Sequence, residues 1–262
     1  MSSSVSRTTA RRSPLRLALV LFVLAAAVAA ALGAWYLFGR GPAPSTVGLT
    51  AVPTASPAPS APAAADPATP GASGTAPATL DGSWSVDTAI GSFDDFSGSF
   101  VGYRVLEELV GIGAATAVGR TPDVSGSLVL EGTTITAVEI TADLTTLRSD
   151  SSMRDGQLGR QGLETDTHPT ASFVLAEPIR LEALPDEGAP FTVSAVGDLT
   201  LHGQTRRVEV RLEALLSGGI VTVVGSLPIA FGDFGMTAPE SMRVLSIDEN
   251  GTMEFQLHLT KD

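Results

Sequence analysis

The side chains best suited to chemistry lie in the C-terminal half of the chain: the adjacent Arg154 and Asp155, and the three histidines His168, His202 and His258. An arginine and a carboxylate in a loop can form charge-assisted hydrogen bonds, either as a structural ion pair or with the polar head of a ligand. A histidine can donate a hydrogen bond to such a head, or act as an acid or base. The histidines are spread over about 90 residues without the i,i+4 spacing of a helical metal site, so we predict no metal.

The sequence offers little for enzymatic catalysis. It contains no cysteine, which excludes thiolate nucleophiles and cysteine-rich zinc sites. It has no Gly-x-Ser-x-Gly motif, and Asp233-Phe234-Gly235 lacks the glycine-rich and catalytic loops that surround a kinase magnesium site. Spacing pairs neither His168 nor His202 with a carboxylate or nucleophile. We therefore predict that the protein is not an enzyme.

Charge is distributed unevenly along the chain. The 16 basic and 28 acidic residues give a formal charge of −12. Five arginines and no acidic residues precede residue 41, so residues 41–262 carry −17, from 11 basic and 28 acidic side chains. An acidic body of this kind repels a phosphate backbone, which argues against nucleic acid as a partner.

The uncharged apolar segment at residues 17–38 is long enough to cross a membrane, because about 20 residues span a bilayer core of roughly 30 Å. Four arginines precede it and one follows, so the positive-inside bias predicts a cytoplasmic N-terminus at residues 1–16 and an extracytoplasmic body. The alternative is a signal peptide cleaved near Ala29-Ala30-Ala31. We expect a single-pass anchor in the cell membrane, or a secreted protein if the segment is cleaved.

Residues 39–79 are predicted to be a disordered linker rich in proline and alanine. The linker holds nine of the 17 prolines, and its only charged residues are Arg40 and Asp66. Such a segment buries too little apolar surface to offset its ordering entropy. At roughly 3.1 Å per residue in an extended conformation, it could act as a stalk on the order of 100 Å long or as a passive spacer.

From residue 80 onward the hydrophobic pattern has the period of β-strands. Apolar and polar residues alternate in 138–144, 208–213 and 253–259, which indicates strands with one buried and one wet face. Glycine-containing turns separate the strands, and Asn250-Gly251 predicts a tight hairpin. The expected inward side chains are Val138, Ile140, Ala142, Leu144, Val208, Val210, Leu212, Met253, Phe255, Leu257 and Leu259.

Three further features complete the domain. Residues 102–109 and 153–161 could form short helices. An insert at 90–100 carries Phe93, Phe96 and Phe100, and is either a lid over a barrel mouth or a self-packed loop. His258 falls on the outward face of its strand and is expected to be exposed. Many short strands indicate a sandwich or a barrel, and alternation alone does not choose between them.

Four short segments, in this order and spacing, resemble the YceI-like family of lipid-binding domains. They are Met153–Leu158, Thr167–Phe173, Gly197–Arg206 and Phe231–Met236. In addition, residues 84–87 are similar to the family's first strand, and 116–120 with 124–130 to its next hairpin. The resemblance covers residues 80–262. It implies an all-β fold, an antiparallel lipocalin-like barrel of about eight strands.

The resemblance also implies a long apolar ligand, typically a polyisoprenoid such as a polyprenyl or quinone-type lipid, and no other cofactor. The family's histidine after Arg-Asp is Gln157 here, and its aromatic pair is Gly162-Leu163, so those contacts do not carry over. The candidate ligand-binding residues are Arg154, Asp155, His168, Phe173, His202, Val210, Leu212, Phe234, Met253, Phe255 and Leu257.

The sequence thus predicts an extracytoplasmic, membrane-tethered protein that holds an isoprenoid-like lipid for carriage, storage or stress protection. Two alternatives stay open. The first is a structural or adhesive surface domain whose barrel is filled by side chains. The second is a lipid- or envelope-modifying enzyme that uses His168 or His202 as acid–base. The oligomeric state is not set by the sequence.

Overall fold

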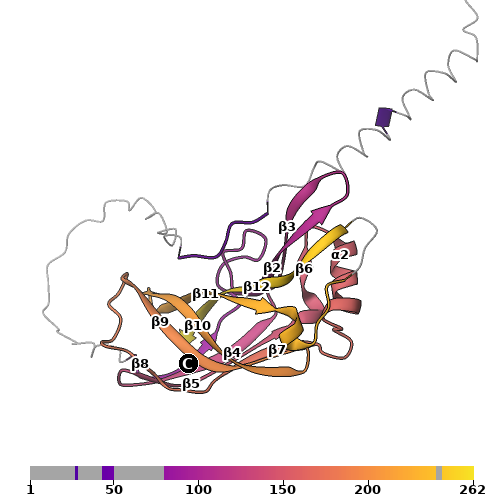
Figure 1. Ribbon diagram of the computed structural model, residues 1–262. Coiled ribbons are helices and arrows are strands. Elements are labelled where there is room, and N and C mark those ends of the chain that lie inside the picture. The colour runs from indigo at the N-terminus through magenta and orange to yellow at the C-terminus, as the bar shows by residue number, and fades with distance from the viewer. Residues whose placement is uncertain (1–26, 29–42, 50–79, 240–243) are drawn as a thin grey trace, which may run out of the picture. The chain divides into compact units, whose positions relative to one another are not determined.

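The computed structural model describes residues 27–28, 43–49, 80–239 and 244–262 (Figure 1). Among these residues, no helix is long and apolar enough to cross a membrane. The expected membrane segment, 17–38, lies outside the described residues except for Ala27 and Val28, which are helical. The expected linker is described only at 43–49, and the compact unit that contains the barrel begins at Ala43.

The folded part is built almost entirely of β-strands, in agreement with the all-β prediction. The strands are β1 (Gly82–Val86), β2 (Phe100–Leu109), β3 (Gly113–Thr121), β4 (Val124–Glu131), β5 (Thr134–Asp143), β6 (Arg148–Ser149), β7 (Thr170–Leu175), β8 (Ile179–Arg180), β9 (Pro190–Leu201), β10 (Gln204–Ser217), β11 (Ile220–Ala230) and β12 (Val244–Lys261). The short helices are η1 (Leu144–Thr146), α2 (Ser152–Gln157), η2 (Leu158–Gly162) and η3 (Phe231–Phe234).

Eight of the strands close into an antiparallel barrel (Figure 1). The order β1-β4-β5-β7-β9-β10-β11-β12 returns to its start because β12 pairs with β1, with Trp84 opposite Lys261. Strands β2, β3 and β6 continue from β12 as a side extension, and β8 pairs with β5. The prediction of an eight-stranded antiparallel barrel is therefore confirmed.

Alternation and turn chemistry explain much of this arrangement. In β5, β10 and β12, the predicted inward side chains line the barrel interior or pack on its core. The β9–β10 hairpin turns through His202 and Gly203, with φ of 50° and 69°, because Leu201 pairs directly with Gln204. A two-residue hairpin turn requires positive φ at both central residues, because only then does the turn match the twist of the flanking strands. Glycine and histidine tolerate this conformation.

Three local predictions are wrong. Residues 102–109 belong to β2 and not to a helix, because pairing with β3 and β12 satisfies their backbone. Asn250-Gly251 is not a hairpin but an irregularity within β12, where the register against β2 shifts between Ile247 and Gly251. Segments 116–120 and 124–130 do not form a hairpin, since β3 pairs with β2 and β6, while β4 pairs with β1 and β5. The helix expected at 153–161 is present as α2 and η2.

The outer face of β12 is covered by the phenylalanine-rich loop. Gln256 Nε2 donates to the carbonyls of Phe96 and Gly98, at 3.2 and 3.0 Å. The ring of His258 lies 2.9 Å from Thr222 Oγ1 and 2.8 Å from the Ser97 carbonyl. His258 is consequently buried and not exposed as predicted. The insert is a loop packed on the outside of the barrel, and its phenylalanines line neither of the internal cavities described below.

A buried ion cluster lies under the same cover. Glu254 is 1% exposed and accepts hydrogen bonds from Arg120 at 2.6 and 3.1 Å and from Arg104 at 3.3 Å. The Arg120 guanidinium also stacks over the rings of Phe96 and Phe100, 4.4 and 4.3 Å from their centroids.

Part of the expected linker completes this cluster. Arg104 donates to the Pro44 and Ser45 carbonyls, at 2.8 and 3.1 Å, and Arg120 to the Ser45 carbonyl at 3.3 Å. Pro44 and Ser45 thus lie against the barrel, where their carbonyls accept hydrogen bonds from the two guanidinium groups that also contact Glu254.

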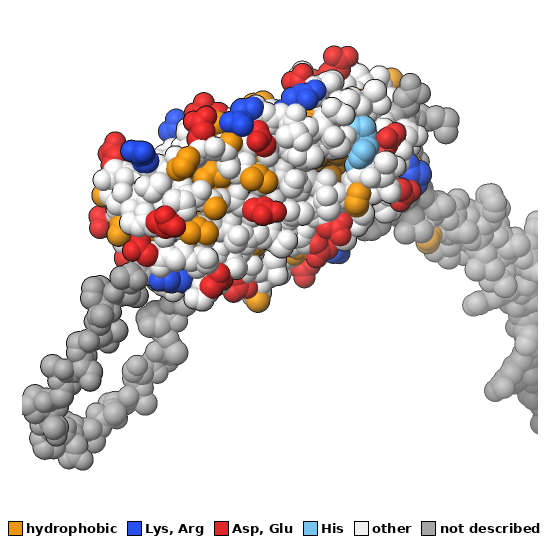
Figure 2. Space-filling view, turned by 90° about the horizontal axis from the view of Figure 1, so that it is seen from below, with side chains coloured by type: hydrophobic (Ala, Val, Ile, Leu, Met, Phe, Trp, Pro, Cys, Tyr) orange, Lys and Arg blue, Asp and Glu red, His pale blue; other side chains and the backbone are white. Residues whose placement is uncertain are grey.

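Acidic side chains outnumber basic ones on the face of the body seen in Figure 2, in line with the composition. Figure 2 shows carboxylates distributed over one face of the body, interleaved with fewer basic side chains and with scattered apolar ones.

Candidate functional site

The folded part contains two apolar cavities, one at the end of the barrel ring, where β2, β3, α2 and η2 also contribute to the wall, and one within the ring. The first, of about 130 Å³, lies toward α2, η2 and the start of β12, and the second, of about 140 Å³, lies deeper in the ring. The first cavity is lined by residues that include Val101, Tyr103, Val105, Glu107, Leu144, Arg154, Leu158, Leu163, Ala171, Met236 and Met253. The second is lined by residues that include Val101, Ile140, Ala171, Phe173, Ala195, Val210, Leu212, Met253, Phe255, Leu257 and Leu259.

The two cavities adjoin at a shared wall. Val101, Ala171 and Met253 line both, so the two cavities are neighbours on either side of these three residues. Met253 has a flexible, unbranched side chain that can adapt to an occupant at this junction. The interior is therefore not filled by side chains, which removes the main support for a purely structural barrel.

The polar groups of this interior gather at the first cavity. Tyr103 Oη is buried without a hydrogen-bond partner in the described structure, and the Glu107 and Arg154 side chains also reach the wall. Burial raises the pKa of Tyr103 above its ordinary value, although the positive charge of Arg154 acts in the opposite direction. An unpaired buried hydroxyl is costly, and a polar ligand group would satisfy it.

Arg154 and Asp155 fix the segment that covers the first cavity. Arg154 donates to Glu107 at 2.6 Å and also pairs with Asp150. Burial by itself lowers the pKa of Arg154, but hydrogen bonds and charge attraction from these two carboxylates raise it above its ordinary value. Asp155 accepts from the Ser149 backbone N–H at 3.0 Å and from its hydroxyl. Of the two predicted polar contacts, only Arg154 reaches the first cavity.

The predicted apolar site residues divide between the cavities and the core. The second cavity holds Phe173, Val210, Leu212, Phe255 and Leu257 on its wall, and Met253 lines both cavities. Phe234 lines neither: it is 3% exposed and packs in a core cluster at the end of the barrel.

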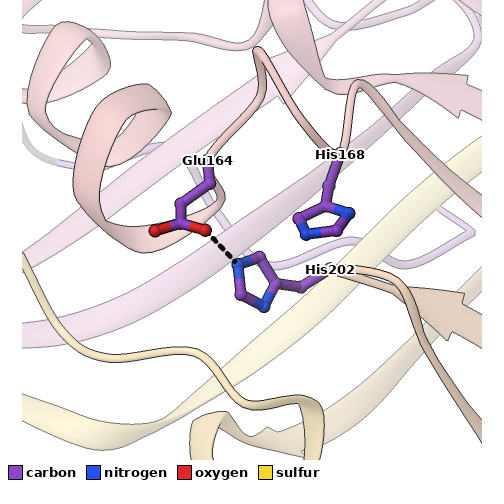
Figure 3. Close-up of side chains that lie close together, drawn as sticks. All are labelled: Glu164, His168 and His202. Atoms are coloured by element: carbon purple, nitrogen blue, oxygen red, sulfur yellow. Dashed lines mark hydrogen bonds and ion pairs between the residues drawn. The ribbon is translucent and has the colours of Figure 1, made fainter.

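His168 and His202 line neither cavity, and His202 contacts Phe234 of η3. The two imidazole rings lie next to each other (Figure 3). Their ring centroids are 4.5 Å apart. His202 Nε2 lies 3.3 Å from Glu164 Oε2, and His202 Nδ1 lies 3.1 Å from the Phe234 carbonyl oxygen. These two predicted residues are thus brought together, but not where they would contact an occupant of the barrel interior.

Sequence reasoning missed Tyr103 and Glu107, which lie in a segment that was expected to be helical. Residues 102–109 have no strict alternation of apolar and polar types, because Leu106 and Glu107 stand on the opposite faces from their kind, so the strand signal there is weak. Gly162 and Leu163 also line the first cavity. They stand where the family resemblance implies an aromatic pair, so this chain has smaller side chains on that wall.

Comparison with known proteins agrees with the barrel fold. The sequence model of the YceI-like domain matches residues 78–259. A search of curated protein sequences gives no match. A solved polyisoprenoid binding domain from Saccharophagus degradans, implicated in plant cell wall breakdown, is 20% identical; the alignment covers 68% of this chain and 98% of that one, with a TM-score of 0.53.

Two further structures have lower similarity. BcnA from Burkholderia cenocepacia is 19% identical over 66% of this chain and 98% of that one, with a TM-score of 0.49. The YCEI protein of Campylobacter jejuni is 14% identical over 55% and 85%, with a TM-score of 0.43. The match to the Saccharophagus degradans domain, at 20% identity, shows the fold alone.

Proposed function

The chain belongs to the YceI-like domain family, and from this premise we propose that it binds a lipid with one long, isoprenoid-like apolar chain and one polar end. The observation that carries the proposal is the pair of adjoining apolar cavities, with the polar side chains of Tyr103, Glu107 and Arg154 on the wall of the first. The structural relative from Saccharophagus degradans, described as a polyisoprenoid binding domain, supports the same class of ligand.

The chemistry of the two cavities suggests the orientation of the ligand. The second cavity is lined by aliphatic and aromatic side chains, and burying a hydrocarbon there is favourable by roughly 25 cal/mol per Å² of apolar surface. The polar end would lie in the first cavity, where Tyr103 Oη has no hydrogen-bond partner among the described residues and Arg154 carries a charge. A few polar groups in an apolar cavity are sufficient to fix orientation. The arrangement serves binding, so we propose a carrier or storage protein rather than an enzyme.

We also propose that the barrel is extracytoplasmic and tethered by residues 17–38. The apolar length of that segment and the arginines before it support this location. A tether near the membrane would let the barrel exchange a lipid with the bilayer. Separating the membrane fraction of cells that produce the chain, followed by protease treatment of intact spheroplasts, tests this; a protected barrel would contradict it.

The binding proposal is tested on the full-length chain, purified in a mild detergent from a host that makes isoprenoid quinones. Native mass spectrometry and organic extraction should show one lipid per chain, of a single class. A chain that carries no lipid, and takes up none on incubation with quinones, polyprenyl lipids or fatty acids, would refute the proposal.

Two variants locate the ligand. Ala195 is 3% exposed on the wall of the second cavity, so Ala195→Phe should fill that space and abolish uptake. Val174 is 46% exposed on the outside of β7, so Val174→Phe is a matched control that should bind normally. Tyr103→Phe should weaken binding by up to about tenfold, the value of one hydrogen bond. Equal lipid occupancy in the Ala195→Phe and Val174→Phe variants would place the ligand elsewhere.

A further inference from the structure

We propose that Glu164, His168 and His202 form a binding site for a divalent transition-metal ion of the Zn²⁺ class. The sequence predicts no metal site, because its histidines lack helical spacing. The fold nevertheless brings His168 and His202 together with the carboxylate of Glu164 (Figure 3). Each of the three residues offers one ligand atom, and these atoms lie within 4.8 Å of one another. Among the described residues, these three are the one group of histidine and acidic side chains whose ligand atoms are close enough to hold a metal ion.

The hydrogen bonding of His202 points to a cation. A carbonyl oxygen can only accept, so the contact of Nδ1 with the Phe234 carbonyl at 3.1 Å places a proton on Nδ1. In the neutral ring, Nε2 then carries a lone pair, and this lone pair faces Glu164 Oε2 at 3.3 Å. Two acceptors in this position repel each other unless a proton or a metal ion lies between them.

This arrangement also has the outer contact that metal-binding histidines usually make. Such histidines donate the N–H of their second nitrogen to a carbonyl or a carboxylate, which fixes the tautomer and the ring orientation. The Phe234 carbonyl does this for His202, and η3, which supplies it, is anchored by the 3% exposed Phe234 side chain. The ligand nitrogen is therefore held in place by the core.

The distances suit a tetrahedral site. With metal–ligand bonds of about 2.0–2.1 Å, ligand atoms in a tetrahedral zinc site lie about 3.4 Å apart. Nε2 of His202 and Oε2 of Glu164, at 3.3 Å, already have this spacing. His168 needs only a small side-chain movement to complete the set. Two histidines and one glutamate leave a fourth position for water, because the Glu164 side chain is 52% exposed.

The backbone is shaped to hold these side chains. Glu164 and His202 both have positive φ, 48° and 50°, which is uncommon for residues other than glycine. At Gly203 a Cβ would lie 2.8 Å from Cε1 of His168, so only glycine lets that ring lie over the hairpin turn. Strain of this kind is maintained where the surrounding structure requires it, and here it directs two of the three ligands to one point.

A bound ion would connect the covering segment to the barrel. Glu164 and His168 follow η2, whose Leu158 and Gly162 line the first cavity, and His202 lies in the β9–β10 turn. The ion would therefore hold the η2 segment closed over the cavity end. This inference does not depend on the proposed lipid, since it concerns side chains outside both cavities.

The test is calorimetric titration of Zn²⁺ into the metal-free, full-length chain without a histidine tag. We expect one ion per chain, a higher melting temperature with Zn²⁺, and intense visible absorption with Co²⁺, as four-coordinate cobalt shows. Losing a residue that only contacts a metal ligand lowers metal affinity roughly 10–100-fold. Because Glu164→Gln, His168→Gln and His202→Asn each remove a ligand itself, each should weaken Zn²⁺ binding at least about tenfold. Asparagine at 202 tolerates positive φ and so preserves the turn.

Two controls make the result decisive. His258→Gln removes the histidine that lies away from the cluster, and Glu182→Gln removes an exposed carboxylate elsewhere; both should bind Zn²⁺ as the unaltered chain does. Because Glu164 is exposed, Glu164→Gln remains informative if a histidine variant unfolds. If Zn²⁺ shows no saturable binding, or binds Glu164→Gln as tightly as the unaltered chain, the proposal is overturned and His202 and Glu164 are only a side-chain contact.

Discussion

Removing the charge of Glu254 should destabilise the barrel strongly, although the residue points away from the interior. Its carboxylate is the acidic partner of Arg120, whose side chain is 4% exposed, and of Arg104, whose side chain is 18% exposed. Glu254→Gln keeps the shape of the side chain but leaves the Arg120 guanidinium buried without a counter-charge. Breaking a buried pair in this way costs about 3–5 kcal/mol of unfolding free energy.

The size of the effect distinguishes the two arginines. Arg104 is closer to solvent and contacts Glu254 at 3.3 Å, so Arg104→Gln should cost only about 1 kcal/mol, as partly exposed pairs do. Replacing both fully buried partners, Arg120→Met with Glu254→Met, removes the uncompensated charge of Arg120 and leaves only the more exposed Arg104 without its carboxylate, so it should recover part of the stability that Glu254→Gln loses.

Urea unfolding followed by circular dichroism measures these differences. The urea concentration at the midpoint of unfolding should be lower for Glu254→Gln than for the unaltered chain, with little change in the slope m. An unchanged m means that the variant is less stable and that the compactness of its unfolded state is unaltered. If Glu254→Gln costs no more than Arg104→Gln, or if the double variant is the least stable of all, the assignment of a critical buried pair is refuted.

Two further predictions concern the interior. A Cβ at Gly197 would lie 2.3 Å from the Phe173 ring and 2.6 Å from the Val174 carbonyl, so Gly197→Ala should cost about 1–3 kcal/mol in urea unfolding, and a cost near zero would show that the strands separate easily. The folded-state pKa of Tyr103 is raised above the unfolded value of about 10, so its neutral form contributes stability below pH 10 that is lost as the pH rises further. From pH 9 to 11 this loss is on the order of 1 kcal/mol, and Tyr103→Phe should lack that part of the pH dependence; identical pH profiles would contradict the burial of the hydroxyl.

The sequence predicts which side chains of a strand face inward better than it predicts which segments cover the outward face. Alternation in β10 and β12 identifies Val210, Leu212 and Phe255 as inward, because a side-chain period of two follows from strand geometry alone. It cannot show what covers the outward face. The alternation in β12 places His258 on the outward face and so predicts that it is exposed. The loop at 87–99 nevertheless covers its ring, through a contact between residues about 160 positions apart. In the same way, Asn250-Gly251 has hairpin chemistry, but pairing on both sides keeps β12 continuous.

The candidate site shows the same limit. Arg154 is recognised from its motif, but its partner Glu107 lies 47 residues earlier on another strand. The approach of His168 to His202 depends on the left-handed turn at 202–203 and on the path of the chain after η2, and no local spacing encodes either. The apolar walls follow from periodicity, whereas clusters of polar side chains depend on how distant segments meet.

Closure of the ring by β12 has a consequence for how the protein folds. This strand pairs with β1 and β2, more than 130 residues earlier, and with the neighbouring β11. Such distant pairings form slowly, because much chain entropy is lost before they are stabilised. Until β12 is in place, the apolar wall is an open sheet with free edges, the kind of intermediate that aggregates. A lipid or a chaperone that covers this wall during folding should therefore raise the yield of closed barrels.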